Sequence, residues 1–420
     1  MVYRTATSCL TALGNVHQQH VVTIEGVNQE ELNPLQQAIC EEGGTQCGFC
    51  TPGFIVSMTG FCLSDKAPTQ AGAVAAVDGN ICRCTGYKSI ERALGRMTAL
   101  LAEKGADASG EDGVDTIGFL IDKGVLPAYF ATIPGRLAAL ALEPNGVFRE
   151  KKGGRFLGGG TDLYVQQHEA MVDANIDFGS VRKELKGIFQ EGGQCVIGGG
   201  ATVMDLMESP VMRKAFPHFD HYARLISSTP IRNIATVAGN FVNASPIGDL
   251  SIFFLAVDAK LLLSDGMFLR ELPLRKFFKG YKQLNKEPGE CILKIFFDMP
   301  GPDELFHFEK VSKRTCLDIA SVNTAMWVRM KGGRIMEGNI SAGGVGPVPA
   351  WLEGASGVLS GRPVGEELVR EVVERAQAEV TPISDARGAA TYKRLLLGQL
   401  IKAHFLTLFP NLGVEALLEI

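Results

Sequence analysis

The chain has 420 residues, of which 46% are hydrophobic and 21% charged, and its formal net charge is −5. This length predicts about two to four domains, and this composition predicts a globular protein. The net negative charge excludes the basic surface that typically binds nucleic acid. No apolar run reaches the roughly 18 residues of a membrane helix, and the N-terminus lacks the apolar core of a signal peptide. We therefore expect a cytoplasmic protein with neither nucleic acid nor a membrane as a partner.

The N-terminal part of the chain predicts one short strand followed by helices. Residues 20–25 are β-branched and alternate weakly, which favours a strand. The first three segments that follow begin at proline or after a threonine cap, and two of them end at glycine. The fourth has apolar residues at helical spacing, namely Ile90, Ala93, Leu94, Met97 and Leu101. We expect helices over residues 34–42, 54–63, 70–78 and 89–103. Thr51 would cap the second of them and Thr69 the third. Residues 29–104 are therefore predicted to form a compact helical unit.

The rest of the chain predicts a mixture of strands and helices. Residues 104–115 are small and acidic, which is typical of a linker. From about residue 119 to residue 300, β-like runs alternate with helical patches and many glycines. From residue 301 onward we expect two strands joined by Lys331-Gly332-Gly333, over residues 321–330 and 334–343, and then two helices over residues 366–379 and 387–408. The predicted fold class is α+β with several domains.

Four of the ten cysteines form two close pairs, Cys47 with Cys50 and Cys82 with Cys84. In a chain without a secretion signal, such pairs indicate metal ligands rather than disulfides. Four thiolates suit either zinc or an iron–sulfur cluster. The Cys-x-Cys spacing is tighter than that of typical zinc sites, so it favours the cluster and leaves zinc open.

Three glycine-containing segments are candidates for binding a ligand. Residues 156–163 (FLGGGTDL) and residues 196–206 (VIGGGATVMDL) each follow an apolar run and precede a helix-like stretch. Glycines let the backbone approach a diphosphate closely, although a plain strand-to-helix turn needs them too. Neither segment has the G-x-G-x-x-G pattern of a Rossmann fold. Residues 231–250 are polar between apolar runs and could bring amide, hydroxyl and carboxylate groups onto one ligand.

The cysteine motifs resemble those of a known family. Residues 46–53 (QCGFCTPG) and 79–87 (GNICRCTGY) resemble the helical two-iron, two-sulfur domain of the xanthine dehydrogenase family of molybdenum hydroxylases. That family also includes aldehyde oxidoreductases and molybdenum carbon monoxide dehydrogenases. The resemblance implies one two-iron, two-sulfur cluster on Cys47, Cys50, Cys82 and Cys84. It also implies a molybdopterin held by a large partner subunit.

Residues 231–250 are similar to the flavin-binding segment of the same family, and residues 156–163 to its diphosphate loop. Ala238 departs from the glycine that is usual there. The resemblance implies a vanillyl-oxidase-like FAD domain followed by a C-terminal flavoprotein domain, and it leaves residues 198–201 a structural role. The implied FAD ligands are Phe156, Leu157, Gly158, Gly159, Gly160, Thr161, Asp162, Leu163, Ile226, Thr236, Gly239, Asn240, Asn243, Asp249, Leu293 and Lys310. No catalytic residue is expected in this chain, because the cofactors carry the chemistry.

The N-terminal residues resemble the end of the plant-type ferredoxin domain that precedes the helical domain in this family. Cys9 would be the fourth ligand of that domain's cluster, and one thiolate cannot hold a cluster. We expect only one cluster in this chain, with either a truncated gene start or a separate ferredoxin-like subunit as the explanation. The expected domains are a ferredoxin remnant over residues 1–28, a helical iron–sulfur domain over 29–104, a linker over 105–118, an FAD domain over 119–300 and a flavoprotein domain over 301–420.

The resemblance implies an electron-transfer subunit of a xanthine dehydrogenase. Electrons would pass from the molybdopterin subunit through the iron–sulfur cluster to FAD and then to NAD. Residues 125–130 and 384–394 look most like those of bacterial xanthine dehydrogenase small subunits. Two alternatives stay open: the same role in an aldehyde, nicotinate or carbon monoxide hydroxylase, or a zinc-stapled binding or assembly protein without electron transfer.

Overall fold

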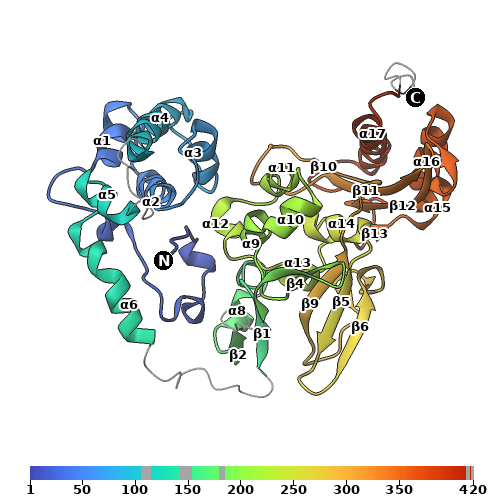
Figure 1. Ribbon diagram of the computed structural model, residues 1–420, viewed down its shortest axis with the longest axis horizontal. Coiled ribbons are helices and arrows are strands. Elements are labelled where there is room, and N and C mark those ends of the chain that lie inside the picture. Colours follow the sequence, from blue (N-terminus) through green and yellow to red (C-terminus); the bar gives the residue numbers. More distant parts are fainter. Residues whose placement is uncertain (106–114, 142–153, 179–184, 413–416, 418–420) are drawn as a thin grey trace. The chain divides into compact units, whose positions relative to one another are not determined.

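The computed structural model of the protein describes residues 1–105, 115–141, 154–178, 185–412 and 417. The chain divides into two compact units (Figure 1). Unit 1 comprises residues 1–150 and 228–233, and unit 2 comprises residues 151–227 and 234–420. Most of the predicted linker, residues 106–114, lies outside the described residues. Among the described helices, none is both long and apolar enough to cross a membrane.

Unit 1 is helical, and local capping interactions begin two of its helices. The side chain of Asn33 accepts hydrogen bonds from the N–H groups of Leu35 and Gln36, and Gln36 bonds back to Asn33 N in a capping box. Thr69 caps the third helix as predicted. The main helices are α1 (Pro34–Glu41), α2 (Thr51–Cys62), α3 (Gln70–Ala76) and α4 (Lys88–Ala102). The remaining elements are η1 (Ser8–Leu10), η2 (Leu13–Val16), η3 (Ile24–Gly26), η4 (Glu103–Gly105), α5 (Thr116–Asp122), η5 (Ala128–Thr132) and α6 (Ile133–Ala141).

Two predictions for unit 1 are wrong. Residues 20–25 form no strand: the chain turns into η3, and Val22 and Ile24 pack against the helical core instead. A strand needs a neighbour for its backbone groups, and α-helices make up the core of this unit. Helix α2 begins at Thr51, with Cys50 rather than Thr51 as its N-cap.

The core of unit 1 forms where apolar faces of the helices meet. Helix α4 buries Ile90, Ala93, Leu94, Met97 and Leu101, the residues whose spacing predicted the helix. They pack with Phe54, Met58 and Phe61 of α2. Burying each large side chain of this kind stabilises the fold by about 1.5–3 kcal/mol.

Residues 228–233 complete unit 1, and α12 (Thr229–Arg232) lies within them. The guanidinium of Arg232 donates to the Asp78 carboxylate at 2.6 Å, and the N–H of Thr229 donates to the same carboxylate at 2.7 Å. Both charged side chains are largely buried. Removing one partner of a buried ion pair costs about 3–5 kcal/mol, so this pair holds the segment firmly to the end of α3.

Unit 2 begins with a five-stranded antiparallel sheet of order β3-β4-β9-β5-β6. Its strands are β3 (Ile188–Glu191), β4 (Gln194–Gly198), β5 (Lys260–Ser264), β6 (Leu269–Pro273) and β9 (Cys291–Asp298). Beside the sheet lie a parallel pair, β1 (Arg155–Leu157) with β2 (Ile176–Phe178), and a hairpin, β7 (Phe278–Gly280) with β8 (Gln283–Leu284). The helices are α7 (Leu163–Gln166), α8 (His168–Met171), α9 (Val203–Glu208), α10 (Pro210–Ala215), α11 (Phe219–Arg224), α13 (Val237–Asn243), α14 (Asp249–Ala256) and η8 (Leu274–Lys276).

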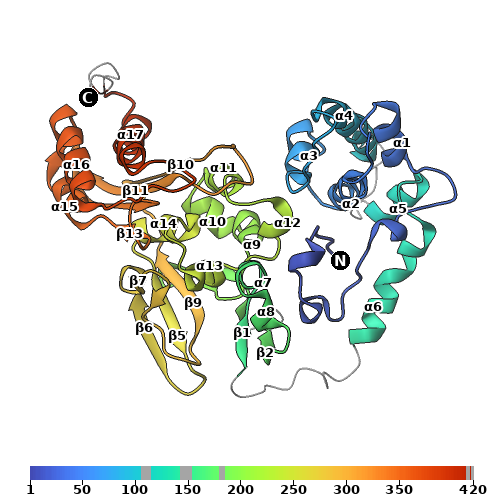
Figure 2. The ribbon, with the colours of Figure 1, turned by 180° about the vertical axis from the view of Figure 1, so that it is seen from behind.

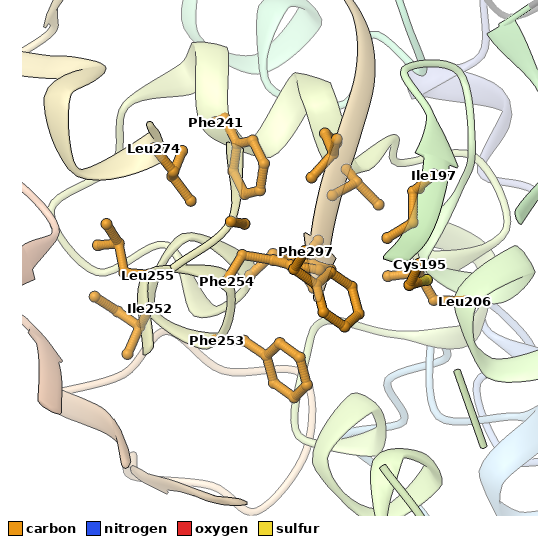
Figure 3. Close-up of a cluster of buried hydrophobic side chains, with 14 of the residues drawn as sticks. Cys195, Ile197, Leu206, Phe241, Ile252, Phe253, Phe254, Leu255, Leu274 and Phe297 are labelled. Atoms are coloured by element: carbon orange, nitrogen blue, oxygen red, sulfur yellow. The ribbon is translucent and has the colours of Figure 1, made fainter. Parts of the chain in front are cut away.

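Helix α14 lies at the centre of unit 2. Every residue from Leu250 to Ala256 is buried, so the helix has no solvent-facing side. Figure 3 shows its phenylalanines Phe253 and Phe254 beside Phe297 of β9, with Phe241 of α13 close to Phe254. The same helix also contacts β11 and β12 of the next sheet. A helix enclosed in this way must be apolar all round.

The C-terminal part of unit 2 is an antiparallel sheet covered by helices. The predicted strands are confirmed as β11 (Val322–Lys331) and β12 (Arg334–Gly343), joined at Gly332 and Gly333, both with positive φ. The other strands are β10 (Glu304–Val311), β13 (Ala350–Trp351) and β14 (Arg362–Pro363). Helices α15 (Glu353–Leu359), α16 (Glu366–Glu379) and α17 (Ala390–Leu408) lie together beside this sheet (Figure 2). Helix α17 begins three residues later than predicted, because Asp385 and Gly388 pair across a tight turn.

Two histidines meet in the buried layer between β10 and α17. The Nδ1 atoms of His307 and His404 lie 2.9 Å apart, and Nε2 of His404 lies 2.7 Å from the Thr324 hydroxyl. One ring must donate and the other accept, so at least the accepting imidazole is neutral. Burial, with smaller contributions from His221 and His218, lowers the pKa of His307 to about 4. Burial also lowers the pKa of His404.

This pair predicts a loss of stability in acid. The histidine pKa values are lower in the folded than in the unfolded chain, so the unfolded chain takes up protons first as the pH falls below about 6.5. The free energy of unfolding should therefore fall between about pH 6.5 and pH 4, by about 3 kcal/mol for His307 alone. Denaturant unfolding at a series of pH values measures this. The His307→Gln variant should show a flatter profile, whereas the exposed control His168→Gln should follow the parent chain. Equal slopes in all three proteins would contradict the assignment.

Candidate iron–sulfur and flavin sites

The four cysteines of the two motifs converge in unit 1. Cys47 and Cys50 come just before α2, and Cys82 and Cys84 lie in the loop before α4. The Sγ atoms of Cys47 and Cys84 are 3.5 Å apart. The thiols of Cys50 and Cys82 are also neighbours. Each close pair therefore joins one cysteine from each motif, a pairing that the sequence spacing did not indicate.

A hydrogen bond and a close approach at a glycine hold the second cysteine motif against α2, and a second hydrogen bond lies within the motif. The Asn80 side chain donates to the Ser57 hydroxyl of α2 at 2.8 Å. The N–H of Cys82 donates to the Tyr87 hydroxyl at 3.0 Å. A Cβ at Gly53 would lie 2.6 Å from the Asn80 side-chain oxygen, so only glycine lets the loop approach α2 this closely. Gly53, in the first cysteine motif, thus leaves room for Asn80, in the second.

Polar neighbours change the acidity of the thiols. The Thr85 hydroxyl lies 3.2 Å from the Cys82 sulfur and is the main cause that lowers the pKa of Cys82 to about 7. The backbone N–H of Phe49 lowers the pKa of Cys47. Burial raises the pKa of Cys50 to about 11. Donors beside a sulfur stabilise the thiolate form, which is the form that binds iron.

The donor set fits a two-iron cluster. Four cysteine thiolates hold such a cluster, and the observed arrangement is two close sulfur pairs. The other cysteines do not join the quartet: Cys62 and Cys195, for example, are buried in apolar cores.

Each of the four cysteines should be needed for the cluster. We expect Cys47→Ser, Cys50→Ser, Cys82→Ser and Cys84→Ser to lose the visible iron–sulfur absorption and nearly all of about two bound irons per chain, because an iron is left without a full set of ligands. Iron analysis and the absorption spectrum of the purified variants measure this. Cys62→Ser and Cys195→Ser are the controls and should keep their iron. Iron content that is insensitive to all four changes would show that the ligands lie elsewhere.

The candidate diphosphate loop, residues 156–163, connects β1 to α7 in unit 2. A Cβ at Gly159 would lie 1.9 Å from the backbone oxygen of Ile234, and one at Gly158 would lie 2.4 Å from the Thr236 hydroxyl. The loop therefore lies directly on the segment that precedes α13. Gly160 has φ +79°, which a side chain disfavours. Two segments that the sequence singled out separately are thus in contact.

Three backbone amides of this loop are available to a ligand. Within the described part of the chain, no hydrogen bond is recorded from the N–H groups of Gly159, Gly160 or Thr161. Successive free amides around a glycine with positive φ form an anion-binding concavity. The loop therefore fits the diphosphate of FAD.

The second glycine segment differs in this respect, although its sequence is similar. The N–H groups of Gly198, Gly199 and Gly200 donate to backbone oxygens of Gly187, Leu293 and Leu185 at 2.7–2.9 Å. A Cβ at Gly199 would lie 1.9 Å from the oxygen of Ile292. These glycines allow strands to pack closely and leave no free amide for a diphosphate. The contact with Gly199 also uses the backbone oxygen of Leu293, one of the proposed FAD residues.

Asp249 and Lys310 form a buried ion pair. The Lys310 ammonium donates to Asp249 at 2.7 Å and to the Leu225 backbone oxygen, next to Ile226, also at 2.7 Å. The amide of Asn323 donates to the other Asp249 oxygen at 2.6 Å. Burial raises the pKa of Asp249, and the ammonium and amide oppose that rise. This group joins α14, β10 and β11, so its polar atoms are fixed before any ligand binds.

The other proposed flavin residues lie on or beside α13. Thr236 caps the helix by accepting from Gly239 N at 3.1 Å. The Asn240 side chain accepts from the N–H and the hydroxyl of Ser251, both at 3.2 Å. Asn243 contacts two residues that the sequence did not single out, Gln166 and Lys282. No sequence signal could have found Lys282, because it lies 39 positions from Asn243 in an ordinary polar stretch.

The candidate sites lie in regions that match known domains. Residues 23–95 match the family model of the [2Fe-2S] binding domain, and residues 139–299 match that of the FAD binding domain in molybdopterin dehydrogenase. Residues 307–408 match the CO dehydrogenase flavoprotein C-terminal domain. The fold class expected from the sequence, with a helical iron–sulfur domain, an FAD domain and a C-terminal flavoprotein domain, is confirmed.

Individual relatives cover most of the chain at low identity. The xanthine dehydrogenase/oxidase of Mus musculus is 26% identical over 98% of this chain and 35% of its own length. Xanthine dehydrogenase 1 of Arabidopsis thaliana is 24% identical over 92% of this chain and 34% of its own. The nicotinate hydroxylase hnxS of Emericella nidulans is 26% identical over 96% of this chain and 38% of its own length. The chain therefore spans about a third of the length of these curated relatives.

Solved structures show the same fold. A chain of the carbon monoxide dehydrogenase of Hydrogenophaga pseudoflava superposes with a TM-score of 0.57 at 28% identity, over 60% of this chain and 88% of that one. A chain of the quinoline 2-oxidoreductase of Pseudomonas putida 86 has a TM-score of 0.56 at 21% identity, which shows the fold alone. Fold, sites and matches together define an oxidoreductase component that carries an FAD domain and a two-iron, two-sulfur domain. In its domains the chain resembles the FAD- and iron–sulfur-binding part of molybdenum hydroxylases.

The close contact at Gly159 predicts the effect of a single methyl group. In Gly159→Ala, the Cβ would lie 1.9 Å from the Ile234 oxygen, so the diphosphate loop must move away from the segment before α13. The purified variant should contain much less FAD than the parent while its iron–sulfur spectrum is unchanged. Flavin absorption per chain measures this. Gly357→Ala in α15 is the matched control, since nothing lies within 4 Å of its Cβ. Full flavin content in Gly159→Ala would place the diphosphate elsewhere.

Proposed function

We propose that the chain is the electron-transfer component of a xanthine dehydrogenase. It would take electrons from a molybdopterin-binding partner through the cluster on Cys47, Cys50, Cys82 and Cys84, and pass them through FAD to NAD. The xanthine dehydrogenase relatives and the domain matches support this proposal.

The exposure of two of the four cysteines is the observation that carries the proposal. Cys47 and Cys84 are exposed. Beside them, Phe49 is 94% exposed and Ile81 61% exposed. Large apolar side chains that are left in solvent around a redox site are typical of a contact surface for another protein. A partner covering Phe49 and Ile81 would bring its own redox centre close to the sulfurs.

In this proposal the chain's own residues bind and orient the cofactors. The amides of Gly159, Gly160 and Thr161 would hold the FAD diphosphate, and Lys310, fixed by Asp249, would supply a positive charge near the flavin. When bound, FAD supplies the exchange between the single electrons of an iron–sulfur centre and the hydride of NAD. No side chain of this chain would act on the purine.

The same observations allow another substrate. A nicotinate hydroxylase is among the relatives, and carbon monoxide dehydrogenases are among the structures. The matched region is the FAD and iron–sulfur part of the family, so nothing in it selects the substrate. The remaining candidate, a zinc-stapled binding protein without electron transfer, would require neither flavin nor iron.

Reduction by substrate tests the proposal. The purified chain, mixed anaerobically with its molybdopterin subunit, should lose its iron–sulfur absorption when xanthine is added, and NADH should reduce its flavin. Rapid reduction of NAD by xanthine is expected only when a ferredoxin-like subunit is also added. Benzaldehyde, nicotinate and carbon monoxide are the parallel substrates. Reduction by one of these and not by xanthine would change the substrate and keep the electron-transfer role. A colourless protein that contains zinc would overturn the role itself.

Introducing a charge at Phe49 tests whether electrons enter through the exposed apolar surface beside the cysteines. Phe49→Asp should keep the spectrum of the chain but slow its reduction by substrate about tenfold or more, because a buried charge weakens the interface. Leu13→Asp, at an equally exposed position of the same unit, should have no effect. Equal rates for both variants would show that electrons enter at another surface.

A further inference from the structure

Lys282 has an unusual place in the fold. It lies in the tight turn between β7 and β8, where Gly280 pairs with Gln283. Its φ angle is +56°, in the left-handed region that disfavours a side chain. Turn positions of this kind ordinarily carry glycine or asparagine. A lysine that keeps this conformation breaks a local rule, and such exceptions tend to mark functional positions.

The ammonium of Lys282 reaches two elements of the candidate flavin site. It donates to the backbone oxygen of Asn243 at 2.5 Å and to the Asn243 side-chain oxygen at 2.8 Å. It also contacts the side-chain oxygen of Gln166 at 3.4 Å. Asn243 is the last residue of α13, and Gln166 is the last residue of α7. A cation at the C-terminal end of a helix is favourable, because the last carbonyl groups there lack partners.

Gln166 extends this connection to the diphosphate loop. Its amide donates to Asp162 at 3.3 Å and to the Asn243 side-chain oxygen at 3.3 Å. Asp162 follows directly after Thr161, whose backbone amide is free for an anion. Burial raises the pKa of Asp162, and the charge of Lys282 opposes that rise. One ammonium therefore connects three segments that are far apart in the sequence: the diphosphate loop, the end of α13 and the β7–β8 turn.

We propose that Lys282 is a positioning residue of the FAD site, which holds the diphosphate loop in its binding conformation by fixing Gln166 against Asn243. This inference rests on the proposed FAD site. Lys282 would act through Gln166 and Asn243 and not through the flavin ring. Glycine or asparagine would relieve the strain at this turn position, but either would lack the ammonium.

Replacing Lys282 should separate FAD affinity from fold stability. Lys282→Gly removes the ammonium and also relieves the strain of a positive φ, so the midpoint of denaturant unfolding should stay the same or rise. FAD should nevertheless bind about fivefold more weakly, the effect of losing about one hydrogen bond. Flavin fluorescence on titrating FAD into flavin-free protein measures the dissociation constant. Lys282→Arg keeps a cation and should restore most of the affinity. Lys279→Met, an exposed lysine of β7, is the matched control and should bind FAD like the parent.

Hydrogen exchange of the flavin-free protein tests the connection without a ligand. The amides of Tyr164, Gln166 and Gln167 are bonded within the loop and α7, so they should exchange faster in Lys282→Gly than in the parent and in Lys279→Met. Unchanged FAD affinity in Lys282→Gly would overturn the inference. Weaker FAD binding with unchanged exchange would also overturn it, because Lys282 would then contact FAD directly. Absence of FAD binding by the parent chain itself would instead refute the proposed flavin site.

Discussion

The carboxylate of Asp249, in the first turn of α14, is held by side chains from two strands of a different sheet. Lys310 of β10 and Asn323 of β11 each bond one of its oxygens. A buried charge is tolerated only with such partners, since the energy of removing it from water must be offset. This one group thus orients the buried helix α14 between the FAD-binding region and the C-terminal sheet. The segment from Asn240 to Asp249 is fixed at both ends, by Ser251 at one and by Lys310 at the other.

Close backbone contacts arrange the rest of the flavin region. At Gly159 the chain passes so near to Ile234 that no side chain fits, and at Gly199 it passes equally near to Ile292. The two glycine runs look alike in sequence but differ in whether their backbone amides donate hydrogen bonds within the protein. In one run the sheet uses them, and in the other they remain for a ligand. A motif alone could not separate these cases, because the difference depends on strands that are distant in the sequence.

Local signals predicted much of the secondary structure. The proline at the start of α1, the Thr69 cap of α3, and the turn at Gly332 and Gly333 are short-range features that act wherever they occur. The predicted strand over residues 20–25 failed because β-branched residues also pack well in an irregular segment against helices. For the candidate site, the motifs predicted which cysteines gather. They did not predict that Cys47 would pair with Cys84, or that Lys282 would reach Asn243, because both contacts depend on tertiary packing.

The exposure of Cys47 and Cys84 bears on the order in which such a protein is assembled. On the proposed assignment, iron and sulfide would reach the four sulfurs from the side on which Cys47 and Cys84 are exposed. A partner seated on Phe49 and Ile81 would close that route. Maturation of the cluster would therefore come before docking of the partner. Until then, two sulfurs only 3.5 Å apart stand open to oxidants, so the immature chain depends on a reducing environment.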